Sequence, residues 1–226
     1  MPYVDGQSGA WKAIATEKVA GGGYQIACKN GSADQYIVWN VDGNGNYTGN
    51  ATGILAGSDM GLQVLETVFQ QDLNGNGTIG PATTTLESFG VTKLVEVGNQ
   101  FFLRDAGGAG PSLKFGGTPF TEGQFGAWKP IGTEQTGSGY KLAWKNGSAD
   151  QYVVWNVDGS GNYTGNATGY VAGSDLNLQV LETAFQQDLN GNGTIGPVTT
   201  TIESFGATKL VEVGNQYFLR DTGGAG

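Results

Sequence analysis

Alternating apolar and polar positions dominate the chain. Tyr24–Lys29 (YQIACK) and Tyr36–Val41 (YIVWNV) are short runs rich in aromatic and β-branched residues, and the polar NGSADQ lies between them. Two such runs around a turn-forming segment predict a β-hairpin. A second hairpin is predicted at Lys93–Arg104 (KLVEVGNQFFLR), where Gly98-Asn99 forms a two-residue loop of the type that tolerates positive φ.

One segment has helical rather than alternating periodicity. In Ser58–Gln71 the apolar residues Leu62, Leu65 and Phe69 recur every three or four positions. This spacing predicts an amphipathic helix of about three turns whose apolar stripe packs on the sheet. Ser58 or Asp59 is suited to cap its first turn.

The chain is a tandem repeat. Residues 24–110 align with 140–226 at an offset of 116, and 72 of the 87 aligned positions are identical. A period of this length is the size of a small domain. We therefore expect module 1 at residues 1–110 and module 2 at residues 118–226. Between them, Pro111–Gly117 (PSLKFGG) is either a linker or an edge strand that neighbouring modules share.

The predicted fold class is mainly β, of the α+β type. Each module is expected to contain antiparallel β-meanders and hairpins with one short helix. Glycine accounts for 41 of 226 residues, which is far above the usual ~7% and is typical of a chain with many tight turns.

The net charge limits the classes of partner that we expect, and the cysteine content limits the possible disulfides. The net charge is −9, from 20 acidic and 11 basic residues, which disfavours nucleic acid and anionic membrane surfaces. Cys28 is the only cysteine, so no intrachain disulfide can form. No run of about 18 apolar residues occurs, and no amino-terminal export signal is evident.

The helix leads into a loop with the spacing of an EF-hand calcium site. Asp72, Asn74 and Asn76 place side-chain oxygens at positions 1, 3 and 5, and Gly77 follows at position 6. Alternating oxygens converge on one cation when the chain curls at the glycine, and position 7 adds a backbone carbonyl. The spacing predicts Ca²⁺ sites formed by two sets of ligands: Asp72, Asn74, Asn76 and the carbonyl of Thr78, and Asp188, Asn190, Asn192 and the carbonyl of Thr194.

The match to a calcium loop is incomplete. Position 12 is Thr83 rather than a bidentate glutamate, and Pro81 excludes an exiting helix. One carboxylate per loop predicts weak binding, with a Kd of about 10⁻⁴–10⁻³ M. Glu66 and Glu87 are candidates to complete the shell. The alternative is a glycine- and asparagine-rich turn without an ion.

A second stretch has nearly the same spacing of oxygen-bearing side chains as the predicted calcium loop. Asp42–Tyr47 (DGNGNY) has oxygens at alternate positions, but Tyr47 stands where the loop needs glycine. Strands are predicted on both sides of it, so we interpret this stretch as a hairpin turn.

Several motifs resemble a known family. The segments GQFGAWKPIGTE, KLAWKNGSADQYVVWNVDG and LQVLETAFQQDLNGNGTIG are similar to the tryptophan-rich C-terminal domain that occurs in tandem in large bacterial proteins, including cyanobacterial ones. The resemblance covers nearly the whole chain. It implies a secreted or cell-surface protein and brings no catalytic residue with it.

Catalysis is not expected. The chain contains no histidine, and Cys28 aligns with Trp144, so a cysteine nucleophile cannot be a feature of the module. Acids recur in both copies, and we interpret them as exposed strand and helix residues; they are Glu17, Glu66, Glu87, Glu96, Glu134, Glu182, Glu203 and Glu212.

The tryptophans support a rival interpretation as a sugar-stacking platform. Trp39 and Trp155 lie in apolar strands and are expected in the core, whereas Trp11 and Trp128 are expected to be more exposed. The position of Trp144 and Cys28 is either a tolerant core site or an edge site.

These observations predict a non-catalytic structural or adhesive repeat of an extracellular bacterial protein, with Ca²⁺-ordered loops and a capacity to polymerise into fibres. The alternative is a lectin-like carbohydrate-binding module that uses exposed tryptophan. The expected partners are neighbouring copies of the module and cell-surface or matrix glycans, with no nucleic acid and no membrane span.

Overall fold

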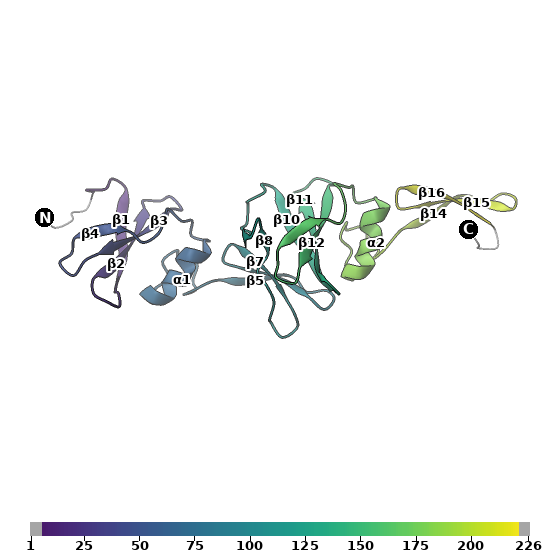
Figure 1. Ribbon diagram of the computed structural model, residues 1–226. Helices are drawn as coiled ribbons and strands as arrows, with labels where there is room; N and C mark the ends of the chain where they lie inside the picture. Colours follow the sequence, from purple (N-terminus) through teal and green to yellow (C-terminus); the bar gives the residue numbers. More distant parts are fainter. Residues whose placement is uncertain (1–5, 222–226) are drawn as a thin grey trace. The chain divides into compact units, whose positions relative to one another are not determined.

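The computed structural model describes residues 6–221 and is mostly antiparallel β-structure with two short helices (Figure 1). The first copy of the repeat contains β1 (Trp11–Lys18), β2 (Tyr24–Asn30), β3 (Tyr36–Val41), β4 (Tyr47–Asn50), α1 (Met60–Phe69), β5 (Thr83–Glu87), β6 (Lys93–Val97) and β7 (Gln100–Arg104). Two short strands follow, β8 (Lys114–Phe115) and β9 (Thr118–Pro119). The second copy contains β10 (Trp128–Thr136), β11 (Gly139–Asn146), β12 (Tyr152–Asp158), β13 (Tyr163–Asn166), α2 (Leu176–Phe185), β14 (Thr199–Glu203), β15 (Thr208–Val213) and β16 (Gln216–Asp221). The predicted fold class is therefore confirmed.

Each copy forms two sheets joined by the helix. The first strands make a four-stranded meander, β1-β2-β3-β4 or β10-β11-β12-β13, and the last make a three-stranded sheet, β5-β6-β7 or β14-β15-β16. Both predicted hairpins are present, because β2 pairs with β3 and β6 pairs with β7. In residues 6–221 neither helix is long and apolar enough to cross a membrane.

The helix of each copy covers one face of its own four-stranded sheet. Asp59 caps α1 by accepting a hydrogen bond from Gly61 N at 2.7 Å. Leu62 and Phe69 of α1 are buried at 0% and 6% exposure. They pack with Ala27, Tyr36, Val38 and Leu73. The predicted apolar stripe thus contacts the sheet, and α2 repeats the arrangement with Leu178 and Phe185.

The opposite face of the second meander is covered by residues of the preceding repeat. Leu142, Trp144, Val153, Trp155 and Val157 of β11 and β12 are buried in one core cluster. The residues that complete this cluster are Leu94, Phe101 and Leu103 of the first copy, Leu113 of the connecting segment Pro111–Gly117, and Phe120 at the start of the second copy. The core therefore draws on both copies of the repeat.

The compact units of the structure are out of phase with the sequence repeats. One unit ends at Thr83 and also holds Val97–Asn99. The other unit holds Thr84–Glu96 together with the chain from Gln100 onward. Most of the β5-β6-β7 sheet thus belongs to the same compact unit as the second copy, whereas the sequence modules 1–110 and 118–226 separate the two.

The segment Pro111–Gly117 makes backbone hydrogen bonds to both copies of the repeat. Leu113 N donates to Phe101 O at 2.7 Å, and Lys114 N donates to Gly161 O at 2.7 Å. Leu113 itself is fully buried. Gly161 has φ +89°, and a Cβ there would lie 2.0 Å from Ser112 O, so only glycine permits this close approach. The segment therefore joins the last sheet of one repeat to the meander of the next.

Candidate functional site

The predicted calcium loop curls around the carboxylate of Asp72. Asp72 Oδ1 accepts hydrogen bonds from Gly75 N at 2.7 Å and Asn76 N at 3.2 Å, and Oδ2 accepts one from Gly77 N at 2.8 Å. Successive backbone N–H groups that converge in this way form a concave anion site. The negative charge at its centre belongs to the protein's own side chain.

The two asparagine oxygens of the loop are also engaged. Asn74 Oδ1 accepts from Asn76 N at 2.9 Å, and Asn76 Oδ1 accepts from Thr78 N at 2.8 Å. The Asn74 amide also donates to Gly57 O at 2.6 Å, which ties the loop to the segment before α1. A cation at this loop would have to compete with these N–H groups for the side-chain oxygens.

Glu66 fastens the loop to the helix from inside. It is 0% exposed, and its Oε1 accepts from Leu73 N at 3.1 Å and Asn74 N at 3.2 Å. Its Oε2 accepts from Gly80 N at 3.0 Å. Three N–H donors therefore satisfy a buried carboxylate that would otherwise be costly to desolvate.

The loop of the second copy has the same hydrogen bonds. Asp188 accepts from the backbone N–H groups of Gly191, Asn192 and Gly193. Glu182 accepts from Leu189, Asn190 and Gly196, and burial raises its pKa. In the part of the chain that the structure describes, no three His, Cys, Asp or Glu side chains gather closely enough to hold a metal ion. The predicted cation would thus depend on one carboxylate together with amide and carbonyl oxygens, and its binding stays a prediction.

Interpreting the recurrent acids as exposed residues was wrong for four of them. Glu66 and Glu182 are 0% exposed, while Glu87 and Glu134 are 6% and 7% exposed. Helix periodicity holds a signal for the first pair, because Glu66 lies four residues after Leu62 and three before Phe69, on the apolar stripe. The burial of Glu87 and Glu134 depends on contacts between the two repeats, so local spacing carries no signal for it.

Glu87 and Glu134 form the polar part of the inter-repeat contact. Glu87 Oε2 accepts from Thr133 N at 3.2 Å, and its Oε1 accepts from Phe89 N. In the reverse direction, Glu134 Oε1 accepts from Val91 N at 3.0 Å. Edge strand β10 of the second copy is thereby joined to the β5–β6 turn of the first. Glu87, a candidate to complete the calcium shell, thus has hydrogen-bond partners of its own at this contact.

This contact perturbs the ionisation of Glu87. Desolvation by burial, together with the nearby charge of Glu134, raises the pKa of Glu87 from 4.5 to about 7. Glu134 Oε2 is buried without a hydrogen-bond partner. The raised pKa of Glu87 makes the inter-repeat contact sensitive to pH near neutrality.

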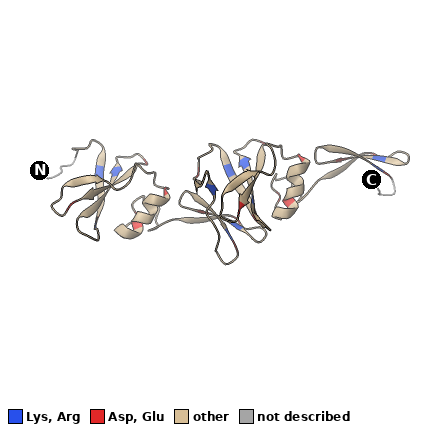
Figure 2. Ribbon diagram, in the orientation of Figure 1, with Lys and Arg blue, Asp and Glu red and all other residues tan. Residues whose placement is uncertain are grey.

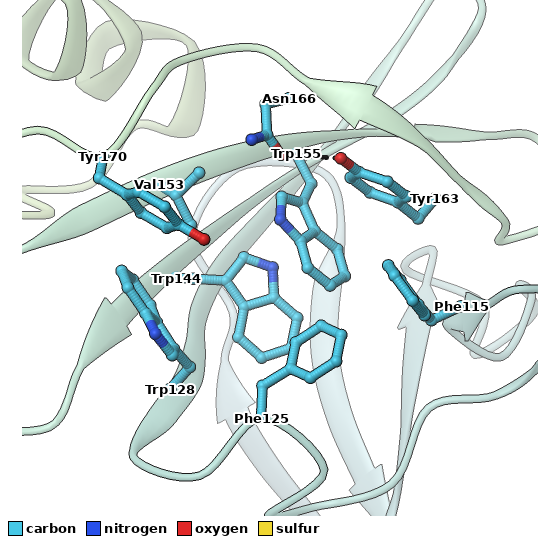
Figure 3. Close-up of a pocket in the computed structure, with 9 residues that line it drawn as sticks. All are labelled: Phe115, Phe125, Trp128, Trp144, Val153, Trp155, Tyr163, Asn166 and Tyr170. Atoms are coloured by element: carbon cyan, nitrogen blue, oxygen red, sulfur yellow. Dashed lines mark hydrogen bonds between the residues drawn. The ribbon is translucent and has the colours of Figure 1, made fainter.

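An aromatic cavity of about 440 Å³ lies beside the inter-repeat core (Figure 3). Trp128 and Tyr170 lie next to each other, with ring centroids 5.4 Å apart, and Tyr170 is 69% exposed. Tyr163 donates a hydrogen bond to Asn166 Oδ1 at 3.0 Å. The remaining lining residues are Phe115, Phe125, Trp144, Val153 and Trp155.

The structure separates the tryptophans less than the sequence predicts. Trp155 is buried, and Trp39 is half-buried. Trp11 and Trp128, expected to be the more exposed pair, are both half-buried. Trp144 and Cys28 are each 1% exposed, so their shared position is a tolerant core site and not an edge site.

Two of the residues that line the cavity were not predicted from the sequence. Phe125 and Tyr170 correspond to Ser8 and Ile54 of the first copy, and these differences between the two copies are the signal that could have found them. The first copy has a smaller hollow of about 230 Å³ at the equivalent place, without these two aromatic rings.

The stretch Asp42–Tyr47 is the hairpin turn that the sequence predicts. Asp42 Oδ1 accepts from Asn44 N at 2.9 Å and Asn46 N at 2.8 Å, between β3 and β4. Hydrogen bonds from the Asn46 side chain and backbone lower the pKa of Asp42. Figure 2 shows that the Lys and Arg residues are separated from one another along the described part of the chain.

Comparison with known proteins gives one match. The sequence model of the family described as the tryptophan-rich Synechocystis species C-terminal domain matches residues 2–80 and 92–196. Searches of curated proteins and of solved structures found no significant match.

Glu87 makes the stability of the inter-repeat core depend on pH. The folded protein holds the Glu87 proton more tightly than the unfolded chain, for which the ordinary pKa is 4.5. The stabilisation is therefore complete below that value and is lost as the pH rises through about 7. We expect the free energy of unfolding in urea to fall by up to about 3 kcal/mol between pH 5 and pH 8.

Glu87→Gln should flatten this pH dependence. Glu203→Gln is the matched control, because Glu203 occupies the same position in β14 but is half-exposed and outside the shared core. An unchanged slope in Glu87→Gln, or an equal change in both variants, would contradict the assignment.

Proposed function

Because the chain belongs to the family of the tryptophan-rich Synechocystis species C-terminal domain, we propose that its repeats are non-catalytic structural modules of an extracellular or cell-surface bacterial array. In such an array each module supplies the sheet that completes the core of the next. The proposed function of each module is to lengthen the array and to link its neighbours. Adhesion follows where the array meets a surface.

The shared core of the second copy carries this proposal. Leu94, Phe101 and Leu103 come from one repeat and pack against the meander of the following repeat. Repeats that cannot bury their apolar faces alone gain stability by stacking on their neighbours. A module of this kind is useful in tandem, which is how it occurs in the chain.

Two further observations favour a structural role over catalysis. The chain has no histidine, which is the commonest general base. The recurrent acids Glu66, Glu87, Glu134 and Glu182 are buried and accept hydrogen bonds from backbone N–H groups. The first and last fix a helix to its own loop, and the middle two join one repeat to the other.

Calcium ordering of the two helix–strand loops is the finer part of the proposal. The oxygens of Asp72, Asn74 and Asn76 and the carbonyl of Thr78 lie within one tight loop, as they do at Asp188, Asn190, Asn192 and Thr194. Binding would exchange several N–H partners for the cation, so the affinity belongs to the weak class of extracellular modules.

Carbohydrate binding is the second candidate function, and the aromatic cavity favours it. The adjacent rings of Trp128 and Tyr170 present apolar faces at the mouth of a concave site. Sites of this shape, lined by aromatic rings with a few polar groups, are typical of small-ligand pockets. The C–H groups of a pyranose ring would stack there.

Two equivalent leucines test the shared core. Leu103 is 0% exposed, whereas Leu219, at the same position in the second copy, is 73% exposed. We expect Leu103→Ala to lower the free energy of unfolding by about 2–5 kcal/mol. Leu219→Ala should change it by less than about 0.5 kcal/mol. Urea unfolding followed by tryptophan fluorescence measures both, and equal effects would show that each repeat folds as a closed unit.

The calcium loops are tested by titration. If they bind Ca²⁺, the melting temperature should rise with millimolar Ca²⁺ and fall again with EDTA, since a ligand that binds only the folded state stabilises it. Asp72→Ala combined with Asp188→Ala should abolish the rise, while Asp42→Ala combined with Asp158→Ala should leave it intact. A melting temperature independent of Ca²⁺ in the unmodified protein would reject the calcium proposal and leave the structural one standing.

The carbohydrate candidate is tested on a glycan array. Binding should be lost in Trp128→Ala and retained in Trp11→Ala, because the first copy has Ile54 in place of Tyr170 and Ser8 in place of Phe125. Adding EDTA to the array separates direct binding from any effect of the calcium loops. No reproducible binding to any glycan would remove this candidate.

A further inference from the structure

The interface inside the chain has two halves, and each half occurs a second time. One half is the face of the β5-β6-β7 sheet that carries Leu94, Phe101 and Leu103. The other is the face of the β10–β13 meander that carries Leu142, Val153 and Trp155. The second copies of these halves are the β14-β15-β16 sheet and the β1–β4 meander.

The β14-β15-β16 sheet, which is the counterpart of β5-β6-β7, presents its apolar face to solvent. Tyr217 and Leu219 stand at the positions of Phe101 and Leu103 and are 67% and 73% exposed, against 3% and 0%. Leu210, at the position of the fully buried Leu94, is half-buried. Large contiguous apolar surface on a soluble protein marks an interaction site.

The first meander is open on the face that the second meander buries. Ile26, Ile37 and Trp39 are half-buried, although the equivalent Leu142, Val153 and Trp155 are at most 6% exposed. A hollow of about 230 Å³ lies on this face, between Ala13, Trp39 and Tyr47. Pro130, the equivalent of Ala13, is buried in the second copy, whereas Ala13 is exposed.

The polar groups of the internal interface recur as well. Its hydrogen bonds run from the N–H groups of Thr133 and Gln135 in β10 to Glu87 and Thr92. Backbone N–H groups of Thr16 and Lys18 in edge strand β1 correspond to those donors, and Glu203 and Thr208 correspond to the acceptors. Both faces therefore match each other in apolar and in polar groups.

From these complementary faces we infer that the β14-β15-β16 sheet of one chain docks on the open face of the β1–β4 meander of a second copy. The contact repeats the internal interface between chains and rests on the proposed structural function. It joins two different surfaces, so it is heterologous, and each added chain offers a new free face. The product is a linear head-to-tail assembly.

The contact between copies is weaker than the internal one for two reasons. Cys28, which is 1% exposed, stands at the position of Trp144, so the first meander lacks one aromatic ring that the internal core contains. Within the chain, Leu113 of the connecting segment and Phe120, which follows it, also contribute to the buried core, whereas the docking of two sheets alone does not use them. The association thus belongs to the weak, concentration-dependent class.

Sedimentation velocity with two complementary variants tests the assembly. Between about 5 µM and about 500 µM, a range suited to weak interfaces, the unmodified chain should form species larger than a dimer. Leu219→Asp blocks the sheet face, and Ala13→Arg blocks the meander face; each variant alone should be monomeric. A mixture of the two retains one intact face of each kind, so it should form dimers and nothing larger.

A charge control and a folding control make the outcome decisive. Val180→Asp places the same charge on α2, where Val180 is 54% exposed and outside both faces, and it should assemble like the unmodified chain. Leu219→Asp should leave the urea unfolding of the shared core unchanged. A monomeric unmodified chain, a mixture without dimers, or loss of assembly in Val180→Asp would each overturn the inference. The structural proposal fails separately, through the comparison of Leu103→Ala with Leu219→Ala.

Discussion

The need to cover two apolar faces of one four-stranded sheet governs this structure. In the second copy, Ala143, Tyr152 and Val154 face the helix, while Leu142, Val153 and Trp155 face the other way. A helix of 10 residues covers one face only. The other face requires a second layer, as sheets that are apolar on both sides do. That layer comes from the preceding repeat, and the connecting segment completes it.

Buried carboxylates stabilise two kinds of contact, one between a helix and the loop that follows it and one between the two repeats. Glu66 gathers N–H groups from the loop after α1, and Glu87 and Glu134 each reach across from one repeat to the backbone of the other. A charged acceptor makes stronger hydrogen bonds than a neutral one, provided that donors satisfy it. The same chemistry therefore fixes the helix to its loop and one repeat to the next.

Local sequence patterns were sufficient to predict the helix and the hairpins. They were not sufficient to predict which other parts of the chain pack against them. Alternation found the hairpins, and the spacing of Leu62, Leu65 and Phe69 found the helix, because both depend on neighbours along the chain. The spacing of Asp72, Asn74 and Asn76 located a tight loop, yet the same oxygens that suit a cation also suit the N–H groups of that loop. A repeat period gives the length of a folding unit but not its phase, so the packing of Leu94 and Leu103 against the following repeat could not be derived from the alignment of copies.

The compact units of the structure are offset from the sequence repeats, and this offset has a consequence for how a gene that encodes tandem repeats can lengthen. Unequal recombination between two near-identical repeats inserts one whole period, wherever the crossover falls. Because the core is built from the end of one period and the start of the next, every inserted period adds one complete junction and disturbs none of the existing ones. The close approach of Gly161 to Ser112 spans that junction, and an inserted period would carry both residue positions with it. Array length can therefore vary over evolutionary time at no cost to the folding of the junctions already present.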